Sequence, residues 1–186
     1  MPNTHIMIDV ETLNTGVSAP IFEIGVCAFS LDERRILGGR QIYLDLLDVI
    51  LKTGFLPNED TVRWWKEQSY SPSDESNSRK SLLSGLVSLS EIVSKNLEGN
   101  GKVWANSPSF DLVLLERHYA VLSMTPPWSY RDEADFRTMR WLYREMGLPE
   151  INMPDKVAHH ALSDAEAQAE HLWKIYGYVL QETSNV

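Results

Sequence analysis

The chain has 186 residues, of which 43% are hydrophobic and 23% are charged, a composition typical of a globular protein. Its length suits one domain, and we expect residues 1–186 to form a single domain. No run approaches the roughly 20 apolar residues of a membrane span, and the first residues lack the pattern of an export signal, so a membrane protein is excluded. With one cysteine, Cys27, the chain cannot form an internal disulfide framework, and we expect a cytoplasmic protein.

The formal net charge of −9 limits how the protein could bind phosphate groups. A protein that coats nucleic acid through bulk attraction to its phosphates should be basic. An acidic chain needs a local basic patch or bound metal ions for the same purpose. The charge therefore excludes passive coating and leaves a metal-dependent phosphate enzyme open.

Three short apolar runs near the start of the chain predict strands, at residues 5–11, 21–31 and 36–45. A charged turn at residues 32–35 separates the second run from the third. Because the connections are short, these strands should form an antiparallel meander.

The rest of the chain alternates between predicted helices and strands. Helices are predicted at residues 58–68, 81–97, 109–122 and 135–146, strands at 102–105 and 128–131, and a serine-rich loop at 69–81. Ser163 and Glu166 have the spacing of a capping box, which predicts a last helix with Asp164 at its first position. Together these elements predict an α/β fold with a mixed sheet flanked by helices.

Asp9 and Glu11 lie two residues apart at the end of the first predicted strand. Because strand side chains alternate between faces, both carboxylates should point the same way. Adjacent carboxylates repel each other unless a cation lies between them, and Mg²⁺ and Mn²⁺ prefer such oxygen ligands. The alternative is a pair of solvated residues at a strand end.

Asp111 and Asp164 are both predicted in the first turn of a helix. The helix dipole favours a carboxylate there, so each residue could be a simple charge cap. His159 precedes Asp164 by five residues on a predicted loop, and a neutral histidine can take a proton from water at physiological pH. The pattern is compatible with a metal ligand beside a base and also with an exposed loop histidine.

In this order and spacing, Asp9-x-Glu11, Asp111 and His159-x-x-x-x-Asp164 resemble the DnaQ-like (DEDDh) 3′→5′ exonucleases, which carry four acidic residues and a histidine. The resemblance implies a ribonuclease H-like fold and hydrolysis of single-stranded RNA or DNA from the 3′ end to 5′-mononucleotides. It also implies two divalent ions, Mg²⁺ or Mn²⁺, with Asp9 bridging them, Glu11 and Asp164 completing one site and Asp111 the other. His159 would take the proton of the attacking water.

Further motifs resemble one subgroup of this superfamily, which contains phage and prophage single-strand exonucleases and a mycobacterial-type exoribonuclease that trims adenine-rich 3′ ends. These motifs are Glu11-Thr12-Leu13, Ala19-Pro20-Ile21, residues 61–69, Trp104-Ala105-Asn106 and Phe136-Arg137-Thr138. The resemblance implies that the terminal nucleotide contacts Thr12, Leu13, Asn106 and Phe110, with packing in the core as the alternative for Leu13 and Phe110. Relatives of this size are often homodimers, so a homodimer is possible. Where glycines would be expected around Asn106, this chain has Ala105 and Ser107, so substrate fit could differ there.

Several assignments have alternatives. His160 competes with His159 as the base, and the spacing of the superfamily selects His159. Trp64 and Trp65 are adjacent and face different sides of a helix, so one is expected in the core while the other could stack on a base.

The densest basic patch consists of Arg131, Arg137, Arg140 and Arg144. It could be a phosphate track, a dimer contact or a solvated face. Two other functions are compatible with the same residues: a nucleic-acid-binding module without catalysis, and a phosphodiesterase of small nucleotides.

Overall fold

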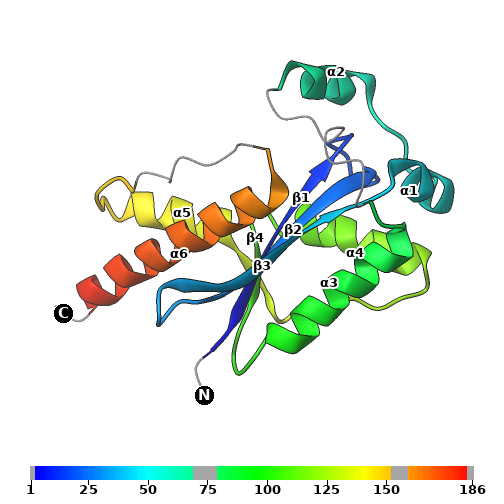
Figure 1. The fold of residues 1–186 in the computed structure, drawn as a ribbon. Helices are drawn as coiled ribbons and strands as arrows, with labels where there is room; N and C mark the ends of the chain where they lie inside the picture. The colour runs from blue at the N-terminus through cyan, green and yellow to red at the C-terminus, as the bar shows by residue number, and fades with distance from the viewer. Residues whose placement is uncertain (1–2, 69–78, 152–158, 184–186) are drawn as a thin grey trace.

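The computed structural model describes residues 3–68, 79–151 and 159–183. Five strands form one central sheet, and helices cover both of its faces (Figure 1). Most of the predicted serine-rich loop, residues 69–81, lies outside the described residues.

The strands are β1 (His5–Thr12), β2 (Ile21–Ser30), β3 (Arg35–Tyr43), β4 (Val103–Ala105) and β5 (Glu133–Asp135). Their order across the sheet is β3-β2-β1-β4-β5. The first three strands are an antiparallel meander, β4 pairs in parallel with β1, and β5 pairs in parallel with β4. This arrangement confirms the predicted α/β class, with a mixed sheet of meander strands followed by parallel strands.

One face of the sheet packs against α1 (Leu46–Thr53), α3 (Leu82–Asn96) and α4 (Asp111–Val121), and the other against α5 (Phe136–Glu145) and α6 (Ala161–Thr183). The short helix α2 (Glu59–Glu67) lies beyond the carboxyl end of β1 (Figure 1). Alternation along β1 divides its side chains between two cores. Ile8 and Val10 join the core beneath α3 and α4, whereas Met7 joins the core beneath α5 and α6. The side chains of Asp9 and Glu11 continue the second face.

Three local predictions were wrong or incomplete. Residues 128–131 are not a strand, because Ser129 and Asp132 hold a turn there: the Ser129 N–H donates to the Asp132 carboxylate at 3.0 Å, and the strand β5 follows. Helix α1 was not predicted, although Asp45 caps its start and Gly54 ends it with a φ of 70°.

The predicted capping box at the last helix is also wrong. Helix α6 begins at Ala161, so Ser163 is its third residue rather than its cap, and Asp164 lies within the first turn. His160 instead accepts the hydrogen bonds at the start of the helix. Its carbonyl accepts a hydrogen bond from the Asp164 N–H at 3.0 Å, and its Nδ1 lies 3.4 Å from the Ser163 nitrogen.

A glycine on β2 brings α6 directly against the sheet. Gly25 pairs with Asp9, and a Cβ added at Gly25 would overlap backbone atoms of Ala161 and Leu162. Only a residue without a Cβ allows this approach. The first turn of α6 is therefore held beside Asp9.

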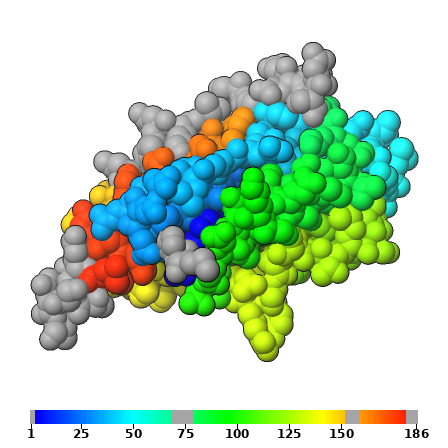
Figure 2. Space-filling view, turned by 60° about the horizontal axis from the view of Figure 1, so that its bottom comes forward, coloured from blue at the N-terminus to red at the C-terminus, as the bar shows by residue number. Residues whose placement is uncertain are grey.

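The strand β3 forms one edge of the sheet and is largely exposed. Figure 2 shows it crossing the surface between α3 and α6. Among the helices in the described part of the chain, none combines the length and hydropathy needed to cross a bilayer.

Candidate active site

The carboxyl end of β1 supplies the first two acidic side chains. Asp9 and Glu11 are both half-buried and share one face of the strand, as predicted from their spacing. Across the antiparallel pairing, Asp9 lies opposite Gly25 and Glu11 lies opposite Glu23, whose side chain is fully buried. This end of the sheet thus holds three carboxylates on adjacent strands.

Asp111 is brought to the same place by the parallel strand β4. Because β1 and β4 run in the same direction, the loop after β4 lies at the same edge of the sheet as Asp9 and Glu11. Asp111 is the first residue of α4, and its side chain is only 5% exposed. Its carboxylate accepts the Ser107 N–H at 3.2 Å. The turn between strand and helix therefore fixes this carboxylate before any ligand binds.

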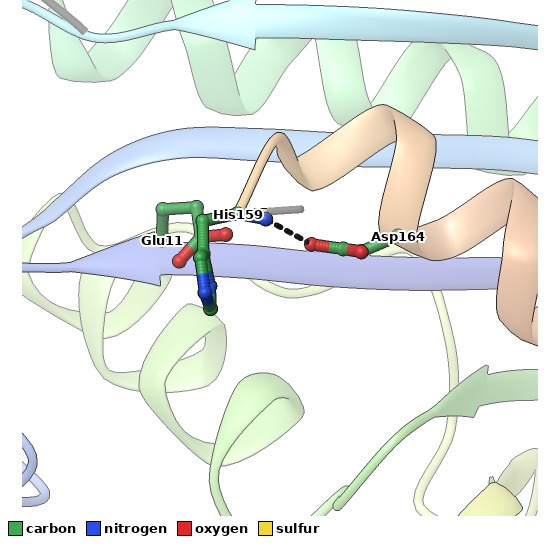
Figure 3. Close-up of side chains that lie close together, drawn as sticks. All are labelled: Glu11, His159 and Asp164. Atoms are coloured by element: carbon green, nitrogen blue, oxygen red, sulfur yellow. Dashed lines mark hydrogen bonds between the residues drawn. The ribbon is translucent and has the colours of Figure 1, made fainter. Parts of the chain in front are cut away.

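The start of α6 supplies Asp164 and His159. The His159 N–H donates to the Asp164 carboxylate at 3.0 Å, and His159 has a φ of 62°, in the left-handed region (Figure 3). One ligand atom from each of Glu11, His159 and Asp164 lies within 4.8 Å of the others. Figure 3 shows these three side chains gathered over β1.

The neighbouring histidine is directed elsewhere. The Nε2 atom of His160 lies 3.4 Å from the Tyr43 hydroxyl, and its Nδ1 atom faces the first turn of α6. Of the two histidines, only His159 is among the described residues that line the cavity at the acidic cluster.

That cavity has a volume of about 560 Å³. All five residues of the predicted catalytic set line it, together with Asn106 and Phe110: Asp9, Glu11, Asp111, His159 and Asp164. The other two predicted substrate contacts, Thr12 and Leu13, are not among its described lining residues. The Thr12 hydroxyl donates to the Asn14 carbonyl at 2.6 Å, and Leu13 lines a separate cavity of about 90 Å³.

Burial and mutual repulsion favour the protonated forms of these carboxyl groups. Burial, with the charges of Asp9 and Asp164, raises the pKa of Glu11 to about 9. Burial and then the charge of Asp111 raise the pKa of Asp9 well above its usual value, although a hydrogen bond from Gln168 opposes this. Burial also raises the pKa of Asp111 to about 6, against backbone hydrogen bonds and the charge of Arg137. A cation at the cluster would remove this cost.

Two further side chains of the cavity were missed by the sequence analysis as parts of the site. Gln168 lies one helical turn after Asp164, and its Nε2 donates to the Asp9 carboxylate at 2.7 Å. The spacing of four residues on one helix face could have indicated it. Arg137, at the start of α5, also lines the cavity. Sequence analysis had placed it in a subgroup motif and in a basic patch but not at the acidic cluster, because the pairing of β4 with β5 is not visible in the chain.

The donor set fits a divalent cation. Four carboxylates converge on one cavity, and these are the oxygen ligands that Mg²⁺ and Mn²⁺ prefer. The Oε1 atom of Gln168 is buried and has no hydrogen-bond donor among the described residues. A water molecule held at such a site could satisfy it.

The two adjacent tryptophans of α2 pack differently, as predicted. Trp65 is buried, and its Nε1 donates to the Thr12 carbonyl at 2.9 Å. Trp64 is 40% exposed, and its ring meets the His159 ring edge-on with centroids 4.7 Å apart. The ring of Trp64 therefore lies against both the histidine at the site and the buried ring of Trp65, whose centroid is 5.1 Å away.

Comparisons with known proteins agree with this geometry. The family model described as the 3′-5′ exoribonuclease Rv2179c-like domain matches residues 4–176. No curated protein sequence matches significantly. Among solved structures, E. coli exonuclease I in complex with a dT13 oligonucleotide aligns with a TM-score of 0.69 at 16% identity, over 96% of this chain and 43% of that one. Cell-death related nuclease 4 aligns with a TM-score of 0.68 at 13% identity, over 95% and 64%.

The chain thus spans less than half of the length of exonuclease I, and these two structural alignments establish the shared fold. The family match covers nearly all of the described residues and confirms the predicted superfamily. The chain belongs to the Rv2179c-like 3′-5′ exoribonuclease domain family.

Proposed function

We propose that the protein hydrolyses single-stranded nucleic acid from the 3′ end to 5′-mononucleotides, using two divalent ions, Mg²⁺ or Mn²⁺. The observation that carries this proposal is the convergence of four carboxylates and His159 on one cavity. A single exonuclease domain formed by residues 1–186 is part of the proposal.

In this proposal Asp9, Glu11, Asp111 and Asp164 hold the metal ions. Bound there, divalent ions would stabilise the charge that develops on the attacking and leaving oxygens. The protein prepares the ligands in advance: Gln168 orients the carboxylate of Asp9 through its 2.7 Å hydrogen bond. Hydrogen bonds of this kind, behind the ligands, fix their orientation and tune their affinity.

His159 is the proposed general base. It would take a proton from water as the water oxygen attacks the terminal phosphorus, while the bond to the 3′ oxygen of the preceding nucleotide breaks and that oxygen gains a proton. The backbone of His159 is tied to Asp164, and its ring rests against Trp64 and Trp65 with centroids 4.7 and 5.9 Å away. These contacts hold the imidazole at the cavity.

The substrate class rests on two lines of support. The description of the family names an exoribonuclease, and E. coli exonuclease I was solved with a single strand of DNA. Asn106 and Phe110 line the cavity beside the carboxylates and are the proposed contacts of the terminal nucleotide. Thr12, the last residue of β1, and Leu13, directly after it, are the other two proposed contacts of that nucleotide. Because the family description names RNA and exonuclease I was solved with DNA, both polymers must be tried.

The decisive experiment compares matched single strands of RNA and DNA, labelled at the 3′ or 5′ end, with Mg²⁺, with Mn²⁺ and with chelator. We expect immediate release of the 3′ label, a ladder from the 5′-labelled strand, and no cleavage in chelator. A free dinucleotide beside the longer strand separates an exonuclease from a small-nucleotide phosphodiesterase. If no polymer is cleaved with either metal, the proposal is wrong.

Two sets of variants test the assigned roles. Asp9→Asn should abolish cleavage while leaving the fold intact, since it removes the proposed bridging charge without changing the size of the side chain. His159→Ala should be inactive and His160→Ala active. An inactive His160→Ala with an active His159→Ala would assign the base to the other histidine.

Two properties complete the proposal. Cys27 is the one cysteine of the sequence, so the chain has no internal disulfide framework, and we propose a cytoplasmic location. The homodimer implied by the superfamily is tested by the mass of the protein in solution.

A further inference from the structure

Three arginines follow one side of α5 away from the cavity. Arg137, Arg140 and Arg144 are three and four residues apart, which places them on one helix face. None of their guanidinium groups forms an ion pair with another residue in the described ranges 3–68, 79–151 and 159–183. Arg131, which sequence analysis grouped with them, precedes β5 and so lies at the opposite end of that strand from α5.

The row begins at the site and leads to a second cavity. Arg137 lines the catalytic cavity beside Asp111. Arg140 and Arg144 line a neighbouring cavity of about 270 Å³ together with His171 of α6. The described lining of this second cavity also includes one carboxylate, Glu150. Guanidinium groups therefore extend from the acidic cluster into a recess that is large enough for a polar ligand.

The helices α5 and α6 run side by side in the same direction from the site. Phe136 contacts His171 with ring centroids 5.6 Å apart, and seven residues later on both helices Tyr143 contacts Tyr178 at 5.8 Å. Equal steps along both helices mean that they are parallel, as Figure 1 also shows. The path from the first cavity to the second therefore follows one continuous junction between two helices.

The side chains of this path accumulate positive charge. Burial and the charges of Arg144 and Arg137 lower the pKa of Arg140, so the three like charges repel one another. Burial and the charges of Arg140 and Lys174 lower the pKa of His171 to about 4, so the histidine is neutral at pH 7. The chain as a whole has a net charge of −9, so binding to phosphates requires a local group of positive side chains. The three arginines beside the site are such a group.

We propose that Arg137, Arg140 and Arg144 form a track for the phosphate groups of the single-stranded substrate, which leaves the active site along the junction between α5 and α6. The seven residues from the first to the last arginine cover about 10 Å of helix axis. A strand with duplex-like spacing carries a phosphate about every 3.4 Å of axis, so the track spans on the order of three phosphates. The inference rests on the proposed function and adds the route of the strand.

Salt-dependent binding of an eight-nucleotide strand tests the track. Fluorescence anisotropy in chelator measures binding without cleavage. Each phosphate contact of a single strand contributes about 0.7 to the slope of log K against log salt. Arg140→Gln with Arg144→Gln should therefore lower the slope by about 1.4 and weaken binding at least tenfold at low salt. Arg144→Gln alone, at an exposed residue, should lower the slope by about 0.7.

Matched variants separate the track from a general effect of charge. Arg35→Gln removes the same charge from an exposed side chain at the edge strand β3, and its slope should equal that of the wild type. Replacing Arg140 and Arg144 by lysine keeps both charges and should keep most of the slope. In cleavage assays, the preference of the glutamine double variant for eight nucleotides over a dinucleotide should fall at least tenfold.

The outcomes distinguish the track from the function on which it rests. If the glutamine double variant binds with the slope of Arg35→Gln, the track is overturned, and loss of a homodimer in the same variant would assign the arginines to a dimer contact instead. If the wild type binds the strand through Arg140 and Arg144 but cleaves it with neither metal, the proposed function fails and the track stands.

Discussion

Replacing Gly25 by alanine should separate the two halves of the active site without changing any polar residue. Its Cβ would overlap the backbone of Ala161 and Leu162 at the start of α6. Ordinary carbon contacts begin near 3.5 Å, so the helix would have to retreat by more than about 1 Å. This retreat would carry Asp164 and Gln168 away from Asp9, since both lie on the first two turns of α6.

The size of both effects follows from this geometry. Overpacking costs about 1–3 kcal/mol, and we expect the upper end because the overlap is with backbone rather than with a flexible side chain. For a chain of this length, 3 kcal/mol corresponds to a fall in Tm of roughly 6–12 °C. A displacement of catalytic groups by about 1 Å can reduce activity roughly 100-fold, so kcat/KM of Gly25→Ala should fall by at least that factor.

Thermal unfolding and initial rates of cleavage test this prediction, with Gly38→Ala as the control. Gly38 is also a strand glycine, but an added Cβ there meets no atom within 4 Å. Alanine at Gly38 should raise stability by up to about 1 kcal/mol and leave cleavage unchanged. The reasoning is refuted if Gly25→Ala unfolds and cleaves like the wild type, or if both alanine variants lose activity equally.

In metal-free protein, the free energy of unfolding should fall as the pH rises from about 4.5 to about 9. Folding raises the pKa of Glu11 from 4.5 to about 9, so the folded state binds this proton more tightly than the unfolded state does. In denaturant titrations, divalent metal should reduce this dependence of the free energy of unfolding on pH. A metal-free stability that increased between pH 4.5 and 9 would contradict the raised pKa of Glu11. Gln168→Leu removes the hydrogen bond to Asp9 and should weaken Mn²⁺ binding, measured by calorimetry, about 10–100-fold. The free energy of unfolding without metal should stay equal or rise, because the variant lacks the buried Oε1 atom that has no hydrogen-bond donor among the described residues. Trp65→Ala should lower the free energy of unfolding by about 3–5 kcal/mol, because Trp65 is buried. Trp64→Ala, at the half-exposed ring beside His159, should leave Tm nearly unchanged and lower kcat. Equal losses of Tm in the two variants would be incompatible with this packing.

Much of the fold and most of the site are visible in the sequence, because they depend on residues close together in the chain. The alternation of β1 puts Asp9 and Glu11 on one face, and the structure confirms this. The meander follows from short connections, and the order of the acidic motifs led to the correct superfamily. These features depend on periodicity and spacing, which a single sequence contains.

The start of α6 shows what local patterns miss. The capping box predicted Ser163 as the cap and Asp164 as the first helical residue, yet the helix begins at Ala161. There Gly25 leaves room for its backbone, and the ring of His160 accepts a hydrogen bond from the Ser163 N–H. The capping-box pattern was overridden by packing against a strand far away in the chain. The same packing turns His159 toward the cavity and His160 toward Tyr43.

The sequence by itself indicated the chemistry proposed for the protein, through the types and order of five residues: Asp9, Glu11, Asp111, His159 and Asp164. Only the tertiary structure decided how these residues act on one another. The raised pKa of Glu11 depends on burial and on charges from other elements, and Gln168 and Arg137 join the site only once β2, β5 and α6 are placed. Burial and electrostatic coupling are set by distances in space, and these distances exist only in the folded chain.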